Sequence, residues 1–131
     1  MIIEDFLPAQ GEGETRINPF FDNLASGILT TTFCPRCTLY HWQPRIVCPR
    51  CLSETLEWRS LPRKGRIYAF SVLESLCVGI IDIGGKVRIL SGIEGNNEIL
   101  HIGDEVFLKV IRLKKKKIFF TFTTDSFYDK D

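Results

Sequence analysis

The chain has 131 residues, of which 44% are hydrophobic, and its 17 basic and 16 acidic side chains give a formal net charge of +1. This length fits one ordinary domain or two very small ones, and it excludes a large multidomain enzyme. The near neutrality excludes the strong positive field of a dedicated DNA-binding domain, so any anion-binding surface must be local.

The charge is distributed unevenly along the chain. Residues 1–33 contain five acidic side chains and one basic, a balance of −4, whereas residues 34–66 contain seven basic and two acidic, a balance of +5. Glu4 and Asp5 lie where a secretory signal peptide would be basic, and the apolar runs are too short to span a bilayer. We therefore expect a soluble cytoplasmic protein, in which cysteines stay reduced.

The first predicted element is a short helix at residues 19–26. Asn18-Pro19 supplies an N-cap followed by proline at the first helical position, and Gly27 supplies a C-terminal stop. Phe20 and Leu24 recur at helical spacing, so we expect them to face either a core or a partner.

Two Cys-x-x-Cys pairs, ten residues apart, follow a predicted strand at residues 29–33. Their members are Cys34, Cys37, Cys48 and Cys51. Four thiolates at this spacing satisfy one tetrahedral ion and leave no position for water or substrate. With a second strand at residues 55–60, the pattern predicts a rubredoxin-like zinc ribbon. The same ligands suit a single iron that carries electrons, but nothing in the sequence indicates a redox partner, so one structural zinc is favoured.

Five further strands are predicted after Gly65, at residues 67–73, 76–83, 86–93, 105–113 and 117–124. Gly84-Gly85 predicts a hairpin turn, and Gly103-Asp104 predicts a turn directly before a strand. Five short strands in about 60 residues indicate a small barrel of the OB type, with an SH3-like barrel as the alternative. The predicted fold is mainly β, with an N-terminal segment at 1–28, a zinc ribbon at 29–62 and an OB-fold barrel at 63–131.

Further motifs accompany this order of elements. They are Phe20-Phe21-Asp22-Asn23-Leu24-Ala25-Ser26-Gly27, Tyr40-His41-Trp42-Gln43-Pro44-Arg45, Gly65-Arg66-Ile67-Tyr68-Ala69-Phe70-Ser71-Val72 and Ile102-Gly103-Asp104-Glu105-Val106. Over residues 17–124 the chain thus resembles the zinc-ribbon plus OB-fold family catalogued as domain of unknown function thirty-five. It departs from the family pattern at Thr38 and Leu52, where members often have the glycine that suits a left-handed turn.

The resemblance implies a non-catalytic accessory subunit of an acyl-CoA-processing complex. Members of this family bind thiolase-type enzymes, including acetoacetyl-CoA thiolase joined to HMG-CoA synthase and thiolase-like aldolases of steroid side-chain breakdown. They help to form a shared acyl-CoA site, so CoA or acyl-CoA is the implied ligand beside one structural zinc.

Two groups of residues are candidates for these contacts. A basic group between ribbon and barrel suits the phosphates of CoA, because guanidinium groups match phosphate oxygens; the alternative is a solvated surface with salt bridges to Glu54 and Glu57. Its members are Arg45, Arg63, Lys64 and Arg66. The candidates for partner binding are Phe20, Phe21, Leu24 and Trp42.

A single-stranded nucleic-acid-binding protein is the alternative function. The basic link and the four lysines at residues 114–117 would contact phosphates, and the barrel aromatics would stack on bases, although most of them are better explained as core. These aromatics are Tyr68, Phe70, Phe107, Phe119, Phe120 and Phe122.

No catalytic residue is predicted. His41 and His101 accompany no nucleophile motif and are interpreted as structural or surface residues. Cys77 lies in an apolar run and is interpreted as a small buried hydrophobe.

Overall fold

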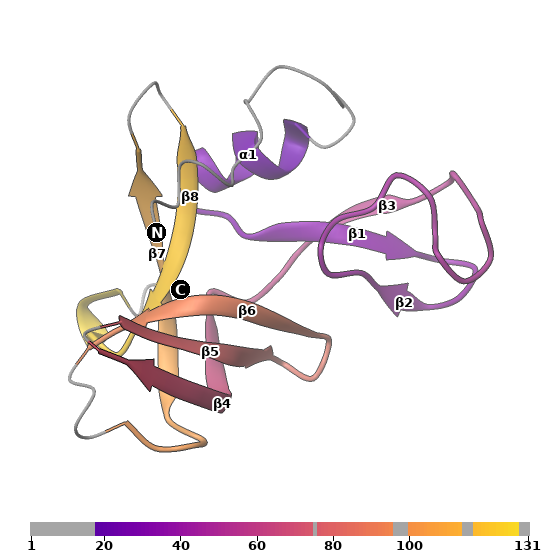
Figure 1. The fold of residues 1–131 in the computed structure, drawn as a ribbon. Coiled ribbons are helices and arrows are strands. Elements are labelled where there is room, and N and C mark those ends of the chain that lie inside the picture. The colour runs from indigo at the N-terminus through magenta and orange to yellow at the C-terminus, as the bar shows by residue number, and fades with distance from the viewer. Residues whose placement is uncertain (1–17, 75, 96–99, 114–116, 129–131) are drawn as a thin grey trace. The chain divides into compact units, whose positions relative to one another are not determined.

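The structure is a computed structural model that describes residues 18–74, 76–95, 100–113 and 117–128 (Figure 1). The chain forms two compact units. The first comprises Met1–Ser60 with Val110–Phe119, and the second comprises Leu61–Lys109 with Phe120–Asp131. The three-segment division expected from the sequence stays a prediction.

Helix α1 (Asn18–Ala25) begins and ends within one residue of the prediction. Gly27, at φ 82°, ends the helix, because the N–H of Gly27 donates to Leu24 O at 2.9 Å and the N–H of Ile28 donates to Asn23 O at 3.0 Å. This pair of bonds is a Schellman motif, which satisfies the last carbonyl groups of the helix.

A three-stranded antiparallel sheet forms the ribbon of the first unit. Strand β1 (Thr30–Cys34) lies between β2 (Leu39–Tyr40) and β3 (Glu57–Ser60). All five residues of β1 are buried, as expected for the central strand. The sequence did not predict β2, because two residues are too few to show a period.

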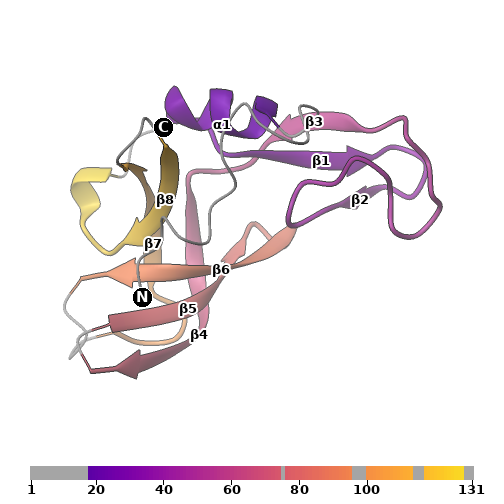
Figure 2. The ribbon, with the colours of Figure 1, turned by 45° about the horizontal axis from the view of Figure 1, so that its top comes forward.

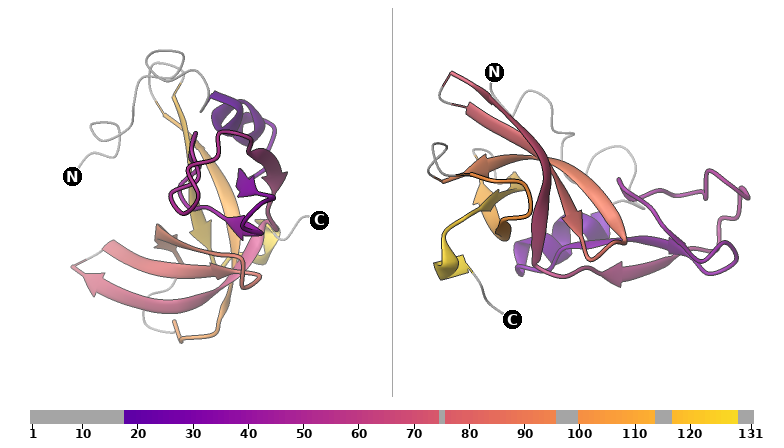
Figure 3. Two further views of the ribbon diagram at one scale, coloured as in Figure 1. Left: turned by 90° about the vertical axis from the view of Figure 1, so that its right-hand side faces the viewer. Right: turned by 90° about the horizontal axis from the view of Figure 1, so that it is seen from below.

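The five strands that follow the ribbon close into a barrel, in which neighbouring strands have the order β4-β5-β6-β8-β7. They are β4 (Lys64–Leu73), β5 (Leu76–Ile83), β6 (Val87–Glu94), β7 (Glu105–Arg112) and β8 (Ile118–Thr123). This closed barrel confirms the mainly β, OB-like prediction. Figures 2 and 3 show β4, β5 and β6 side by side.

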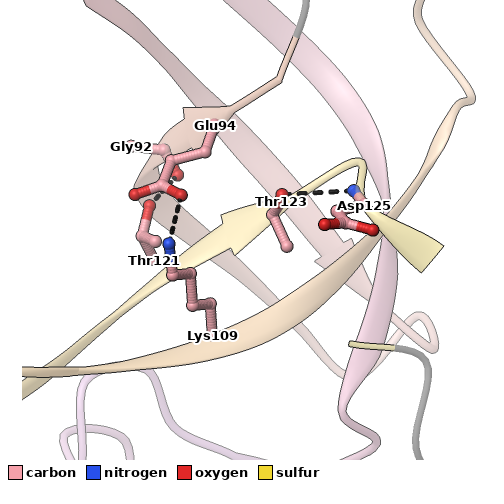
Figure 4. Close-up of polar contacts among 6 residues, drawn as sticks. All are labelled: Gly92, Glu94, Lys109, Thr121, Thr123 and Asp125. Carbon is pink, nitrogen blue, oxygen red and sulfur yellow. Dashed lines mark hydrogen bonds and ion pairs between the residues drawn. The ribbon is translucent and has the colours of Figure 1, made fainter. Parts of the chain in front are cut away.

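The barrel closes where β6 pairs with β8 in parallel, with Ile93 opposite Phe122. Across this seam the hydroxyl of Thr121 on β8 donates to the carbonyl of Gly92 on β6 at 2.8 Å (Figure 4). The ammonium of Lys109 on β7 also donates to the carboxylate of Glu94 on β6, at 2.7 Å. A 3-10 helix, η5 (Ser126–Tyr128), follows β8. The seam joins residues far apart in sequence, so the barrel depends on long-range contacts.

Alternate residues of the barrel strands point into the core. In β5 the inward positions Cys77, Gly79, Ile81 and Ile83 are buried, and the positions between them are partly or largely exposed. The barrel core is aliphatic with few aromatic rings, and its most deeply buried side chains are Ile67, Ile81, Ile83, Ile89, Val106, Leu108 and Phe122. The burial of Cys77 confirms its interpretation as a small core residue.

Among the residues that the structure describes, no helix has both the length and the hydrophobicity required to cross a bilayer. The predicted lysine turn between the last two strands includes residues 114–116, which lie outside the described residues.

Candidate functional site

The four paired cysteines converge at the end of the ribbon. Their sulfur atoms all lie within 4.8 Å of one another, with 3.7 Å between Cys34 and Cys51 and 3.9 Å between Cys37 and Cys48. Four sulfurs at about 2.3 Å from a tetrahedral centre would be about 3.8 Å apart. The donor set therefore fits one zinc ion, with Cys34 and Cys48 buried and Cys37 and Cys51 half-buried.

Both cysteine pairs are followed by a residue in the left-handed region. Thr38 has φ 52° and Leu52 has φ 63°, the two positions where the resemblance expects glycine. In the second turn, Leu52 N–H donates to Cys48 O at 2.8 Å and Cys48 N–H donates to Ser53 O at 2.9 Å. The chain thus adopts the tight turn without glycine, at the backbone cost of a non-glycine residue with positive φ.

Replacing these residues by glycine is expected to stabilise the zinc-loaded protein. We expect Thr38→Gly and Leu52→Gly each to raise the free energy of unfolding by about 1 kcal/mol, because glycine adopts positive φ without strain. Leu52 is 73% exposed, so its side chain contributes little buried area. Urea unfolding in excess zinc measures the change. Thr55→Gly and Leu39→Gly are matched controls without positive φ and should destabilise; equal losses in all four variants would contradict the strain argument.

The sulfurs of the cluster differ in acidity. The backbone N–H groups of Cys51 and Arg50 donate to the Cys48 sulfur and lower the pKa of Cys48 to about 6, against an ordinary value of 9.0. The pKa of Cys37 is raised to about 12, chiefly by its side-chain hydrogen bond with Cys51 and by burial. The hydrogen bonds from Cys51 and Arg50 therefore favour the thiolate of Cys48, and the thiolate is the form that ligates metal.

The predicted phosphate-binding residues fall in both units. Lys64 and Arg66, on β4, line an open cavity of about 360 Å³ in the second unit, together with Pro62, Gly65, Asp82, Gly84, Gly85 and Glu105. Arg66 donates to Gly103 O at 3.1 Å and pairs with Glu105 at 3.3 Å. Lys64 makes no ion pair with the described residues, so it is the freer of these two cations.

The other two predicted cations do not line this cavity. Arg63 is half-buried, and its Nε atom is buried without a hydrogen-bond partner among the described residues. Arg45 belongs to the first unit, where its backbone N–H donates to the Thr32 hydroxyl at 2.9 Å and its side chain is exposed. The structure therefore brings Lys64 and Arg66 together and leaves Arg45 as a separate candidate.

The predicted partner-binding residues are largely internal to the first unit. Phe20 and Leu24 are 6% and 0% exposed, so they face the core, which was one of the two expectations for their spacing. Phe21 and Trp42 are half-buried, and both rings pack edge-on against Phe20, at centroid distances of 5.2 and 5.9 Å. Within this group, Phe21 and Trp42 are therefore the residues whose side chains are exposed enough to contact a partner.

An apolar surface that was not predicted from the sequence lies on the outside of the barrel. We call it the outer apolar face, and its members are Tyr68, Ala69, Leu73, Leu76, Val78, Ile80 and Leu90. Ala69, Ile80 and Leu90 lie side by side across β4, β5 and β6, and Leu73 pairs with Leu76. Leu90 is 73% exposed and Leu73 is 60% exposed. Contiguous large apolar side chains in water mark an interaction surface.

The outer apolar face ends at the cavity. Its next row across the three strands consists of Arg66, Asp82 and Arg88, and Arg66 and Asp82 also line the cavity. The Arg88 guanidinium lies over the Tyr68 ring, 3.9 Å from its centroid. A partner seated on this face would therefore lie beside Lys64 and Arg66. A sequence signal for this surface exists, because the run at residues 76–81 is apolar on both faces of β5 and so departs from the alternation of a half-buried strand.

This short chain carries a four-cysteine cluster of zinc-ribbon geometry and a closed OB-like barrel. Its class is therefore that of proteins that combine a zinc ribbon with an OB-like barrel. Two of the solved structures that match this chain illustrate the shared fold. One is described as the Ltp2-ChsH2(DUF35) aldolase: the TM-score is 0.72 at 16% identity, and the match covers 89% of this chain and 98% of that one. The other is a protein of unknown function from the DUF35 family of Sulfolobus solfataricus, with a TM-score of 0.64 at 13% identity over 94% of this chain and 92% of that one.

These structure neighbours are DUF35 proteins, so the resemblance stated from the sequence is confirmed at the level of the fold. No family model matches the sequence, and no curated protein matches it.

Proposed function

We propose that this chain is a non-catalytic accessory subunit that binds a thiolase-type condensing enzyme and helps to form a shared acyl-CoA site. The outer apolar face carries the proposal, because an isolated barrel gains nothing from exposing Leu73, Leu76 and Leu90 together. The fold shared with a protein described as the Ltp2-ChsH2(DUF35) aldolase supports the choice of partner.

The side chains that the structure describes do not favour a reaction centre within this chain. The cysteine cluster offers four ligands to one ion, which leaves no open coordination position for a substrate. Cys77 is 2% exposed, and burial raises the pKa of its thiol, so it is a poor nucleophile. We therefore assign the chemistry of the complex to the partner enzyme and assign zinc a structural role.

The cavity beside the outer apolar face is the proposed contribution to the CoA site. Lys64 and Arg66 offer cationic donors to phosphate, while Asp82 and Glu105 offset their charge. A phosphate would have to compete with Glu105 for Arg66, at 3.3 Å. Lys64 is therefore the primary phosphate contact in this proposal, and Arg66 is recruited when the anion binds. The partner would complete the wall of this open cavity.

Capture from a native extract tests the partner. We expect the tagged chain to retain a thiolase or an HMG-CoA synthase, identified by mass spectrometry, and we expect Leu90→Asp to weaken its binding at least tenfold, because a charge would enter an apolar interface. Ile102→Asp is the matched control, since Ile102 is 70% exposed in the same unit but lies off the outer apolar face. Retention of the same enzyme by Leu90→Asp at unchanged affinity would exclude this face as the interface.

Calorimetric titration of the purified complex with CoA tests the cavity. Lys64→Gln combined with Arg66→Gln is expected to weaken CoA binding about tenfold or more, because a charged hydrogen bond to phosphate contributes about 1.5–3 kcal/mol. Arg59→Gln is the control, since Arg59 pairs with Glu57 at 2.7 Å in the other unit. Equal CoA affinity in all variants would remove the cavity from the proposal and leave the partner interface standing.

Single-stranded nucleic acid is less well supported as the ligand. Of the six barrel aromatics considered for stacking, Phe107, Phe120 and Phe122 are buried, and Tyr68 is the most exposed at 48%. One exposed ring under an arginine is a small stacking platform for a strand. An oligonucleotide shift with steep salt dependence, in a chain recovered without an enzyme, would reverse this ranking.

A further inference from the structure

Strand β4 has an edge that is only partly paired. It pairs with β5 from Arg66 to Leu73, whereas its pairing with β7 on the opposite edge ends at Arg66. Ile67 then bonds to the loop at Gly103 and Asp104. In the part of the chain that the structure describes, no strand pairs with this edge beyond Ile67, and β4 borders the β4-β5-β6 layer on the side away from β6 (Figure 1). We call residues 69–73 on this side the free edge, because their backbone groups are available to another strand.

The composition of the free edge favours pairing. Its sequence, Ala-Phe-Ser-Val-Leu, contains neither a charge nor a proline. Ser71, Val72 and Leu73 are exposed in succession, so the end of the strand is accessible from both faces of the sheet. The β-bulge of β4 lies between Ile67 and Ala69, and the residues after it keep a regular register with β5. Natural sheets protect an exposed edge with charge, proline or a bulge, and none of these falls within the free edge.

The order of side chains along the free edge is self-complementary. Two copies of β4 can pair antiparallel about a two-fold axis at Ser71. Phe70 of one copy then lies opposite Val72 of the other, on the inner face of the sheet. Ala69 lies opposite Leu73 on the outer face. An aromatic ring beside a β-branched side chain is a favourable cross-strand pair, and a small alanine leaves room for a leucine.

A second copy of this chain is therefore the occupant that fits the edge. Identical strands paired about a two-fold axis place like charges near one another wherever the pairing segment is charged, and the free edge has no charge to repel. Val72 and Leu73 are 44% and 60% exposed, so pairing would cover apolar surface as well as add backbone hydrogen bonds. One contact between two copies would pair the free edges of both.

We propose that this chain forms a homodimer in which the free edges of two copies pair antiparallel, centred on Ser71. The result is one continuous sheet with the strand order β6-β5-β4-β4-β5-β6. The inference does not depend on the proposed enzyme partner. Pairing at an edge uses the backbone and leaves the face of the sheet uncovered, so most of the outer apolar face stays accessible in the dimer.

Sedimentation equilibrium of the zinc-loaded full-length chain, purified without a partner, tests the dimer. We expect a mass twice the 15.0 kDa of one chain. Ser71→Lys should reduce it to the mass of one chain, because the axis would place two ammonium groups side by side. Leu90→Lys is the matched control and should stay dimeric, since Leu90 is 73% exposed on β6, two strands from the free edge.

Two sedimentation results would overturn the proposal. One is a single-chain mass for the unmodified protein at every concentration in the series. The other is a dimer that Ser71→Lys leaves intact or that Leu90→Lys dissociates, because the contact would then lie away from the free edge. Neither result bears on the enzyme partner, which is tested by capture.

Disulfide cross-linking tests the register without adding a charge. Ser71→Cys would place two thiols opposite each other, at a Cα separation of about 4.5–5.5 Å that a disulfide spans. Leu73→Cys is the matched control, since its two thiols would lie four residues apart along the paired strands, about 13 Å. We expect mild oxidation to link Ser71→Cys chains to each other and to leave Leu73→Cys chains unlinked. Equal linkage of both variants, or of neither, would overturn pairing centred on Ser71.

Discussion

Removal of zinc is expected to unfold the ribbon while the barrel strands β4, β5 and β6 stay folded. Between residues 29 and 60 the buried hydrophobic side chains are Leu29, Phe33, Cys34 and Cys48, which is too small a core for independent stability. Structural zinc contributes about 10–16 kcal/mol of apparent binding free energy in small zinc domains, so it supplies most of the folding free energy here. Amide resonances of the ribbon should collapse on chelation, and those of β4 to β6 should remain dispersed.

Thiol titration gives the matching chemical result. One equivalent of zinc should be released as four cysteines become reactive, and buried Cys77 should react slowly before and after chelation. Cys77→Ser is the control and should keep its zinc, whereas Cys48→Ser should lose it. A ribbon that stays folded after complete zinc removal would contradict the structural role of the metal.

Truncation of Phe122 is expected to have the largest effect on the barrel. Phe122 is 0% exposed, lies opposite Ile93 at the β6–β8 seam and packs edge-on against Phe120 at 5.9 Å. We expect Phe122→Ala to lower the free energy of unfolding by about 3–5 kcal/mol, because it leaves a cavity at the only parallel strand pairing described in the barrel.

Denaturant unfolding of the zinc-loaded chain measures this change. Phe127→Ala is the matched control, since Phe127 is 67% exposed, and its effect should stay below about 1 kcal/mol. A similar decrease in the free energy of unfolding for Phe122→Ala and Phe127→Ala would contradict the proposed contribution of the β6–β8 seam to stability.

Local signals in the sequence accounted for most of the elements. Asn18-Pro19 and Gly27 bounded α1, the glycine pair at 84 and 85 gave the β5–β6 turn with φ 57° and 72°, and alternation gave all five barrel strands to within a few residues. The cysteine spacing was sufficient for the metal centre, because two short turns that each direct two sulfurs at one point need no other information.

Features that depend on long-range pairing were not accessible in this way. Strand β2 has two residues and exists because Phe33 and Cys34 offer it partners. The helical spacing of Phe20 and Leu24 is compatible with contacts to a partner and with contacts to a core. The tertiary structure shows that both side chains are buried in the core. The Thr32 hydroxyl contacts both the Nδ1 atom of His41 and the backbone N–H of Arg45, each at 2.9 Å, and the fold brings these groups together from different parts of the ribbon.

By itself, then, the sequence determined the mainly β architecture and the four metal-binding sulfurs, since each of these follows from residues close together in the chain. The left-handed positions at Thr38 and Leu52 were indicated by the family resemblance, because members often have glycine there. The tertiary structure alone decided which side chains face outward, that Lys64 and Arg66 meet at one cavity, and that Leu73, Leu76 and Leu90 form one apolar face beside it. The physical reason is register: a strand alternates in either direction, and its pairing partners decide which alternate set is covered and which remains available for binding.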